Sequence, residues 1–199
     1  MDDILGITLH LARVCQGLGL RYVVGGSLAS SLHGIPRATQ DVDLVIAMVQ
    51  DDVPRLVSAL GSDFYLDEDA IRDAVERRSS FNLIHLGSYF KADVFVARDD
   101  EPTRSQFSRS QAYSIGGERS DELVVASPED VVAQKLHWFA LGDHVSERQW
   151  SDALGVLKVA GPRLDWAYLG RVCAMLGVED LLDKAKRTVD PGHPDAGPS

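Results

Sequence analysis

Residues 22–46 constrain the fold more than any other stretch of this sequence. Two short apolar runs, 22–24 and 42–46, flank a segment rich in glycine and other small residues. Short β-branched runs that end at glycine are typical of buried strands. The pattern therefore predicts two strands that are connected through a glycine turn and a short helix.

The glycine turn has the features of an anion site. Gly25 and Gly26 allow a sharp change of backbone direction and leave amide groups uncovered. Ser27 follows as the expected N-cap of a helix over residues 28–32. Uncovered amides beside a helix N-terminus suit a phosphate group. This segment is therefore a candidate phosphate site.

Asp41 and Asp43 occupy alternate positions at the start of the second strand. Side chains at i and i+2 of a strand lie on the same face, so the two carboxylates should be close together. They repel each other unless a cation lies between them, and Mg²⁺ prefers such oxygen ligands and commonly bridges carboxylates and substrate phosphates. The alternative is an ordinary strand edge with two solvated aspartates. The upstream glycines and the intervening Arg37 favour the metal site.

A third acid, Asp93, lies within an apolar run that has the alternation of a strand. Residues 81–86 and 89–96 are predicted to form a hairpin with a two-residue turn at 87–88. Alternation puts Lys91 and Asp93 on the same face of the second strand. Asp93 is either a polar residue on an exposed sheet face or a third ligand that completes a metal pair and accepts a proton.

These residues together resemble a known signature. Gly-Gly-Ser, a short helix and then Arg-x-Thr-x-Asp-x-Asp-Leu is similar to the pattern of the nucleotidyltransferase fold shared with DNA polymerase β. Within that superfamily, the chain is most similar to the small bacterial branch of AbiEii/MenT-like toxin nucleotidyltransferases and their uncharacterised relatives. The resemblance covers residues 22–97 and extends more weakly to the regions around Lys135 and Asp152. The residues that match the first part of the pattern are Gly26, Ser27, Asp41 and Asp43.

The resemblance implies transfer of a nucleoside monophosphate from an NTP to a hydroxyl acceptor. It implies that Asp41, Asp43 and Asp93 bind Mg²⁺ or Mn²⁺, with Asp93 also acting as the base. The residues that it places near the nucleotide are Gly25, Gly26, Ser27, Arg37 and Lys135. For two of these an alternative stays open: Arg37 fixes the loop only, and Lys135 is a surface lysine that extends its ammonium into water. Asp152 is expected to support Lys135 or Arg148.

The acceptor that follows from this resemblance is RNA, a protein or a small molecule. The toxin-like branch favours tRNA or a protein target and implies a cognate antitoxin as partner. The alternative function is a non-catalytic nucleotide-binding module of the same fold. A hydrolase with the same metal site is less favoured, because no histidine that would activate water joins the motif.

The length and the order of the predicted elements indicate an α/β (α+β) protein of 199 residues. The resemblance implies a mixed sheet flanked by helices and followed by a C-terminal helical part. We expect a nucleotidyltransferase-like core over residues 1–126 and a helical region over 127–187. A disordered tail rich in proline and glycine is expected over 188–199.

Composition narrows the classes of partner. The formal net charge of −10 argues against broad nucleic-acid binding but is compatible with one local basic groove. No apolar run has the length of a membrane span, and no signal peptide is recognised at the N-terminus. Cys15 and Cys173 lie in apolar helical contexts and are expected to be core residues of a cytoplasmic protein.

Overall fold

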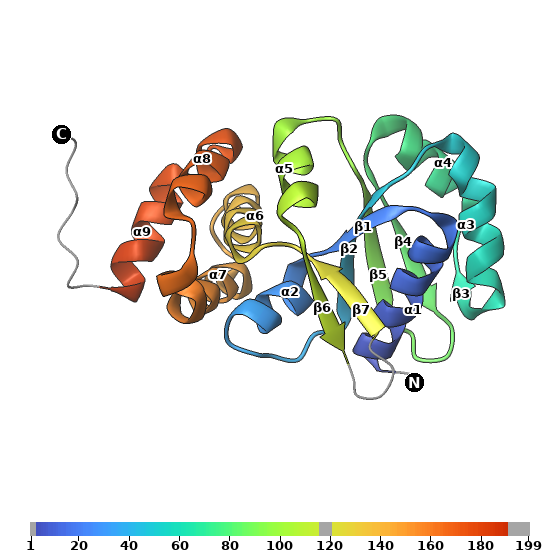
Figure 1. Ribbon diagram of the computed structural model, residues 1–199, viewed down its shortest axis with the longest axis horizontal. Helices are drawn as coiled ribbons and strands as arrows, with labels where there is room; N and C mark the ends of the chain where they lie inside the picture. Colours follow the sequence, from blue (N-terminus) through green and yellow to red (C-terminus); the bar gives the residue numbers. More distant parts are fainter. Residues whose placement is uncertain (1–2, 116–120, 191–199) are drawn as a thin grey trace. The chain divides into compact units, whose positions relative to one another are not determined.

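The computed structural model describes residues 3–115 and 121–190 (Figure 1). They form two compact units. The sheet unit is built from Met1–Ala29 and Arg37–Ser127, and the helical unit from Ser30–Pro36 and Pro128–Ser199. The boundary after Ser127 lies next to the division predicted at residue 126, but the segment Ser30–Pro36 belongs with the C-terminal helices.

The sheet unit contains a mixed sheet of seven strands within the described residues, in the order β3-β4-β5-β2-β1-β7-β6. The pairs β2–β5 and β1–β7 are parallel, and the other neighbouring pairs are antiparallel. The strands are β1 (Arg21–Val24), β2 (Asp41–Ala47), β3 (Phe64–Tyr65), β4 (Ser80–His85), β5 (Lys91–Val96), β6 (Gln111–Ile115) and β7 (Asp121–Val125). This architecture confirms the predicted α/β class with a mixed sheet.

The two faces of the central strands differ in burial. In β2, Val42, Leu44 and Ile46 are buried, whereas the alternate residues, which include Asp41 and Asp43, are more exposed. β5 repeats this alternation. Because side chains alternate along a strand, one face of the sheet forms the core and the other carries the acidic side chains.

Helices of the sheet unit pack on one another and on the sheet. α1 contacts α3, β1, β2 and β7, and α3 also contacts α4; these three helices lie together on one side of the sheet (Figure 1). Asp3 caps α1 by accepting a hydrogen bond from the amide of Gly6 at 2.7 Å, and Gly19, with φ of 71°, ends the helix. The helices of this unit are α1 (Ile4–Leu18), α3 (Val53–Leu60), α4 (Glu68–Arg77) and α5 (Glu101–Arg109), with short 3₁₀ turns at Gln50–Asp52 and Gly61–Asp63. The residues of α2 (Gly26–His33) are divided between the two units.

The helical unit is organised around α6, which contacts each of the other three C-terminal helices. Its helices are α6 (Pro128–Leu141), α7 (Glu147–Ala160), α8 (Trp166–Leu176) and α9 (Glu179–Val189), with a 3₁₀ turn at Gly161–Arg163. A Cβ atom on Gly34 would lie 2.7 Å from the backbone nitrogen of Val156. This close approach explains why the segment around Gly34 packs with the C-terminal helices rather than with the sheet.

The predictions of a hairpin over residues 81–96 and of a tail over 188–199 can be compared with the structure. The hairpin between β4 and β5 exists, but its loop is longer than the predicted two residues: the amide of His85 donates to the carbonyl of Phe90, and the amide of Tyr89 donates to the carbonyl of His85. Tyr89 adopts a left-handed conformation with φ of 60°, which closes the longer loop. α9 continues to Val189, and the rest of the predicted tail, 191–199, lies outside the described residues.

Both cysteines are buried, as predicted, and carry free thiols. Burial raises the pKa of each thiol to about 12. None of the helices in the described ranges combines the length and the apolar character that a bilayer span requires.

Candidate active site

The structure brings the three predicted acids together on one face of neighbouring strands. β2 and β5 are parallel, and their register places Asp43 directly beside Asp93 and Asp41 beside Lys91. We call Asp41, Asp43 and Asp93 the carboxylate site. Since all three acids point away from the buried face, they remain accessible to a ligand.

Lys91 is the residue of this site to which sequence reasoning gave no role. Its Nζ lies 2.9 Å from Oδ2 of Asp93, and both side chains are partly exposed. The hydrogen bond to Asp93 raises the pKa of the Lys91 ammonium, and the charges of Asp93, Asp41 and Asp43 add to this effect. The Lys91 ammonium therefore interacts electrostatically with all three carboxylates. The i, i+2 spacing of Lys91 and Asp93 was the only sequence signal for this contact.

Gly26 lies against the carboxylate of Asp43. Its φ of 57° is in the left-handed region, and a Cβ atom placed on it would come within 1.7 Å of Oδ2 of Asp43. The preceding amide, that of Gly25, donates a 2.9 Å hydrogen bond to the carbonyl of Asp43. A side chain at position 26 would be strained and would displace Asp43. Glycine is therefore required here by both backbone conformation and close approach.

The helix after the glycine turn starts earlier than predicted. α2 begins at Gly26, so the prediction that Ser27 is its N-cap is wrong: Ser27 lies within the first turn. Its hydroxyl oxygen accepts a 2.6 Å hydrogen bond from Nη2 of Arg37, and Nη1 of Arg37 donates to the carbonyl of Ala38 at 3.2 Å. Arg37 thus closes the loop between α2 and β2. The first turn of α2 has the positive end of the helix dipole beside the acids.

Lys135 and Asp152 lie in the helical unit, on α6 and α7. Their side chains are only 6% and 5% exposed, and Nζ of Lys135 lies 2.8 Å from Oδ2 of Asp152. This contact bears out the expectation that Asp152 supports Lys135, and it shows that Lys135 is not a surface lysine. The predicted contact of Lys135 with nucleotide phosphates stays a prediction.

A second buried polar contact stabilises the same unit. The hydroxyl of Tyr168 donates a 2.7 Å hydrogen bond to Oδ1 of Asp130, and Glu129 accepts a 2.8 Å hydrogen bond from the amide of Asp165. Both acids belong to the first turn of α6, where negative charge complements the helix dipole. These buried acids therefore hold α8 onto α6 and have a structural explanation.

The donor set of the carboxylate site suits a hard divalent cation. All of its candidate ligands are carboxylate oxygens, which Mg²⁺ and Mn²⁺ prefer. Across residues 3–115 and 121–190, no three His, Cys, Asp or Glu side chains are already gathered where one metal ion would bind them. Asp93 instead forms an ion pair with the ammonium of Lys91. The chemistry of the residues fits a metal that competes with Lys91 for the same negative charge.

No protein-family model and no curated protein sequence matches the chain. Solved structures do match. The solution structure of the antibiotic-resistance factor ANT(2'')-Ia has a TM-score of 0.54 at 14% identity and covers 94% of this chain and 99% of its own. A crystal structure of ANT(2'')-Ia in complex with adenylyl-2''-tobramycin has a TM-score of 0.53 at 15% identity, with coverages of 86% and 95%.

A third similar structure is an antigenic nucleotidyltransferase-like protein from Paracoccidioides brasiliensis. Its TM-score is 0.53 at 19% identity, and the match covers 96% of this chain and 98% of that chain. At such identities the likeness concerns the fold. The chain therefore has the nucleotidyltransferase fold, as the resemblance of its sequence implied.

Proposed function

We propose that this protein is a metal-dependent nucleotidyltransferase that moves a nucleoside monophosphate from an NTP to a hydroxyl acceptor. The observation that carries the proposal is the pairing of Asp43 with Asp93 on adjacent parallel strands, with Gly26 packed against the Asp43 carboxylate. Three acids on one accessible face next to a glycine turn and a helix N-terminus suit a triphosphate with its cation. The nucleotidyltransferase fold of the chain supports the same activity.

In this proposal, the glycine turn and the first turn of α2 hold the triphosphate. The backbone amide at Gly26 and the hydroxyl of Ser27 are its donors, and the guanidinium of Arg37 neutralises part of its charge. The amide of Gly25, which the sequence predicted to be uncovered, donates to the carbonyl of Asp43 instead, so Gly25 contributes through the turn and not as a donor. Nη2 of Arg37 already donates a hydrogen bond to the Ser27 hydroxyl oxygen, so the two side chains are held next to each other. Asp41 and Asp43 hold the cation, which when bound neutralises the phosphates and polarises the α-phosphorus.

Asp93 is proposed to act on the acceptor. The acceptor hydroxyl oxygen forms a bond to the α-phosphorus while the bond between that phosphorus and the bridging oxygen breaks, and pyrophosphate leaves. The carboxylate of Asp93 takes the hydroxyl proton. Lys91, at 2.9 Å from Asp93, holds this carboxylate on the accessible face before the ligand arrives.

The acceptor can be RNA, a protein or a small molecule. The sequence resemblance to AbiEii/MenT-like toxins favours tRNA or a protein, with a cognate antitoxin as partner. A structural neighbour, ANT(2'')-Ia, was solved with adenylyl-2''-tobramycin, in which the nucleotide is carried by a small molecule. All three acceptor classes therefore belong in one experiment.

The proposal is tested by following the α-phosphate. The protein is incubated with each α-labelled NTP, with Mg²⁺ or EDTA, and with total RNA, tobramycin or no added acceptor, which leaves the protein itself. We expect label to pass to one acceptor only when Mg²⁺ is present, and Asp41→Asn to abolish the transfer. Metal-dependent NTP binding without transfer to any acceptor would instead select the non-catalytic nucleotide-binding module. Failure of the parent protein to bind any NTP with Mg²⁺ would overturn both.

A further inference from the structure

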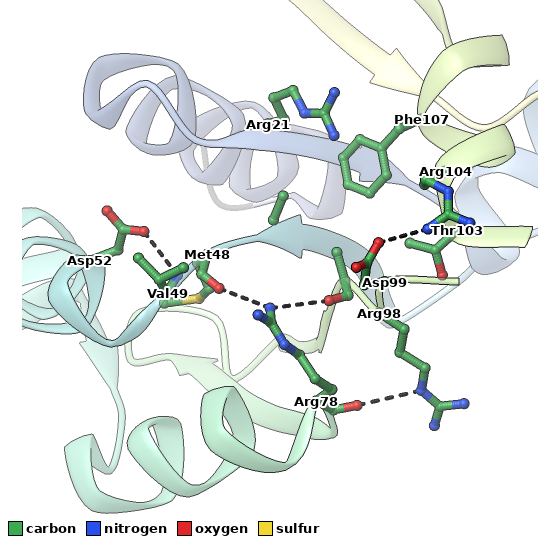
Figure 2. A pocket seen from close by; sticks show the side chains of 12 residues that line it. Arg21, Met48, Val49, Asp52, Arg78, Arg98, Asp99, Thr103, Arg104 and Phe107 are labelled. Atoms are coloured by element: carbon green, nitrogen blue, oxygen red, sulfur yellow. Dashed lines mark hydrogen bonds and ion pairs between the residues drawn. The ribbon is translucent and has the colours of Figure 1, made fainter. Parts of the chain in front are cut away.

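A concave site lies where β2 and β5 end, whereas the carboxylate site lies at the start of β2. It is a pocket of about 410 Å³ (Figure 2). Ala47, which lines it, is the last residue of β2, whereas Asp41 is the first. Six residues of strand at roughly 3.3 Å each separate the two positions by about 20 Å. The pocket is therefore distinct from the carboxylate site, and we call it the arginine pocket.

The charge of the arginine pocket is opposite to that of the whole chain. Four arginines line it, Arg21, Arg78, Arg98 and Arg104, against two aspartates, so two positive charges remain. The chain as a whole carries a formal net charge of −10. One of the two acids, Asp52, is already engaged by the amide of Val49 and by Arg55, which lies outside the lining. A local excess of positive charge in an acidic protein indicates an anionic ligand.

Arg78 is fixed at the base of the pocket. Its Nη1 donates to the carbonyl of Met48 at 3.2 Å and to that of Ala97 at 3.3 Å, just beyond the ends of β2 and β5. Its remaining N–H groups make no hydrogen bond within the described part of the chain. Figure 2 shows this guanidinium reaching up between the two strand ends. Arg78 thus presents positioned donors without having to be ordered by a ligand.

Arg21 forms the opposite wall of the pocket. Its guanidinium carbon lies 4.8 Å from the centre of the Phe107 ring, a cation–π contact that orients the side chain. Within the described ranges the side chain of Arg21 makes no hydrogen bond, so its guanidinium N–H groups are available. A guanidinium that stacks through its face keeps its edge open for a phosphate.

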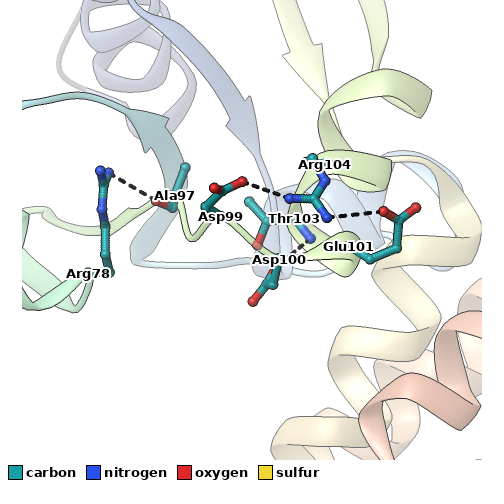
Figure 3. Close-up of polar contacts among 7 residues, drawn as sticks. All are labelled: Arg78, Ala97, Asp99, Asp100, Glu101, Thr103 and Arg104. Carbon is teal, nitrogen blue, oxygen red and sulfur yellow. Dashed lines mark hydrogen bonds and ion pairs between the residues drawn. The ribbon is translucent and has the colours of Figure 1, made fainter.

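The other two arginines, Arg98 and Arg104, shape the rim of the pocket. Arg104 is held by Asp99 at 2.7 Å and by Glu101 at 3.4 Å (Figure 3). Arg98 donates a long 3.5 Å bond to the carbonyl of Arg78, and its guanidinium points away from the centre of the pocket in Figure 2. Exposed ion pairs of the Arg104 kind contribute little to stability. They shape the rim, whereas Arg21 and Arg78 supply the donors.

We propose that the arginine pocket binds a small organophosphate. The phosphate is held by Arg21 and Arg78, whose planar guanidinium groups match its oxygens. The carbon skeleton of the ligand contacts Phe107, Val49 and Ala47, which supply the apolar part of the lining. The volume falls in the range of small-molecule sites, and the lining combines charged side chains with apolar ones, as a ligand with a phosphate and a carbon skeleton requires.

The test uses the full chain in EDTA, so that binding at the carboxylate site does not contribute. Phenyl phosphate, inorganic phosphate and phenol are titrated, and binding is followed by calorimetry and by the amide resonances of Val49 and Asp99. We expect phenyl phosphate to bind saturably and more tightly than inorganic phosphate, and phenol not to bind. Arg21→Ala should weaken phenyl phosphate at least about tenfold, the scale of a lost charge-assisted hydrogen bond.

Matched variants separate this site from the surface and from the proposed activity. Arg77→Ala removes an exposed arginine that pairs with Asp73 and does not line the pocket, so it should leave the dissociation constant unchanged. Asp41→Asn should also leave it unchanged. Arg21→Glu should abolish binding, with thermal unfolding as the check on folding. The proposal is overturned if phenyl phosphate does not saturate, if Arg21→Ala binds like the parent, or if Asp41→Asn removes the binding.

Discussion

The two units each contain a lysine–aspartate ion pair of nearly the same length but of different burial. Lys91 and Asp93, in the sheet unit, are 2.9 Å apart with side chains 42% and 24% exposed. Lys135 and Asp152, in the helical unit, are 2.8 Å apart and 6% and 5% exposed. Distance therefore does not distinguish them, whereas access to water does. Separating a buried pair would leave a buried charge without its partner, so such a pair has a structural role. In an accessible pair, one residue can leave the other and bind a ligand at little cost.

The largest expected difference between the two pairs is in stability. Asp152→Ala would leave the Lys135 ammonium buried without its partner, which should lower the free energy of unfolding by about 3–5 kcal/mol. Asp93→Ala removes the same group from an accessible pair and should cost only about 0–1 kcal/mol. Urea unfolding of both variants measures the difference. Equal costs would mean that burial does not separate the two pairs.

The second prediction concerns function at the accessible pair. Asp93→Asn keeps the size of the side chain but cannot accept a proton, so transfer should slow at least about a hundredfold while Mg-NTP binding persists. Asp73→Asn, on an exposed helical pair with Arg77, is the control and should transfer at the parental rate. Near-parental transfer by Asp93→Asn would make Asp93 a strand residue without a role in chemistry. Loss of Mg-NTP binding would instead make it mainly a metal ligand.

The third prediction uses two adjacent glycines that differ in surroundings. A Cβ on Gly26 overlaps the Asp43 carboxylate, and its φ is positive, whereas a Cβ on Gly25 meets nothing within 4 Å. Gly26→Ala should cost about 1–2 kcal/mol in backbone strain alone and should weaken NTP binding, because Asp43 must move. Gly25→Ala should leave stability nearly unchanged. Calorimetry with Mg-NTP and thermal unfolding report both effects, and equal behaviour of the two variants would remove the reason for glycine at position 26.

The carboxylate site was predictable because its signals are local. Alternation along β2 and β5 indicates which residues share a face, and Gly25 and Gly26 mark the turn between strands. The sequence resemblance then grouped Asp93 with Asp41 and Asp43, whereas the parallel pairing of β2 with β5 that brings them together was not predicted. The start of α2 was misplaced because Gly26 enters the helix in a left-handed conformation that no local pattern specifies.

Other features depend on contacts between distant segments. Ser30–Pro36 belongs to the helical unit because Gly34 fits closely against α7. No sequence pattern in either segment predicts this contact. The arginine pocket gathers residues from the start of β1, the end of α4 and the segment around α5. Its arginines have no common spacing, so charge periodicity does not reveal it. Lys135 was predicted as one of two alternative partners for Asp152, and the burial of this pair was not predicted.

The central claim is that the carboxylate site binds a divalent cation together with an NTP, and isothermal titration of NTP into the parent and Asp41→Asn tests it most directly. The parent is expected to bind NTP with Mg²⁺ and to lose the binding in EDTA. Asp41→Asn is expected to show no Mg²⁺-dependent binding while unfolding like the parent, because it removes one charge from a group of mutually repelling acids. If Asp41→Asn binds Mg-NTP as the parent does, the cation is not held at this site and the account is contradicted.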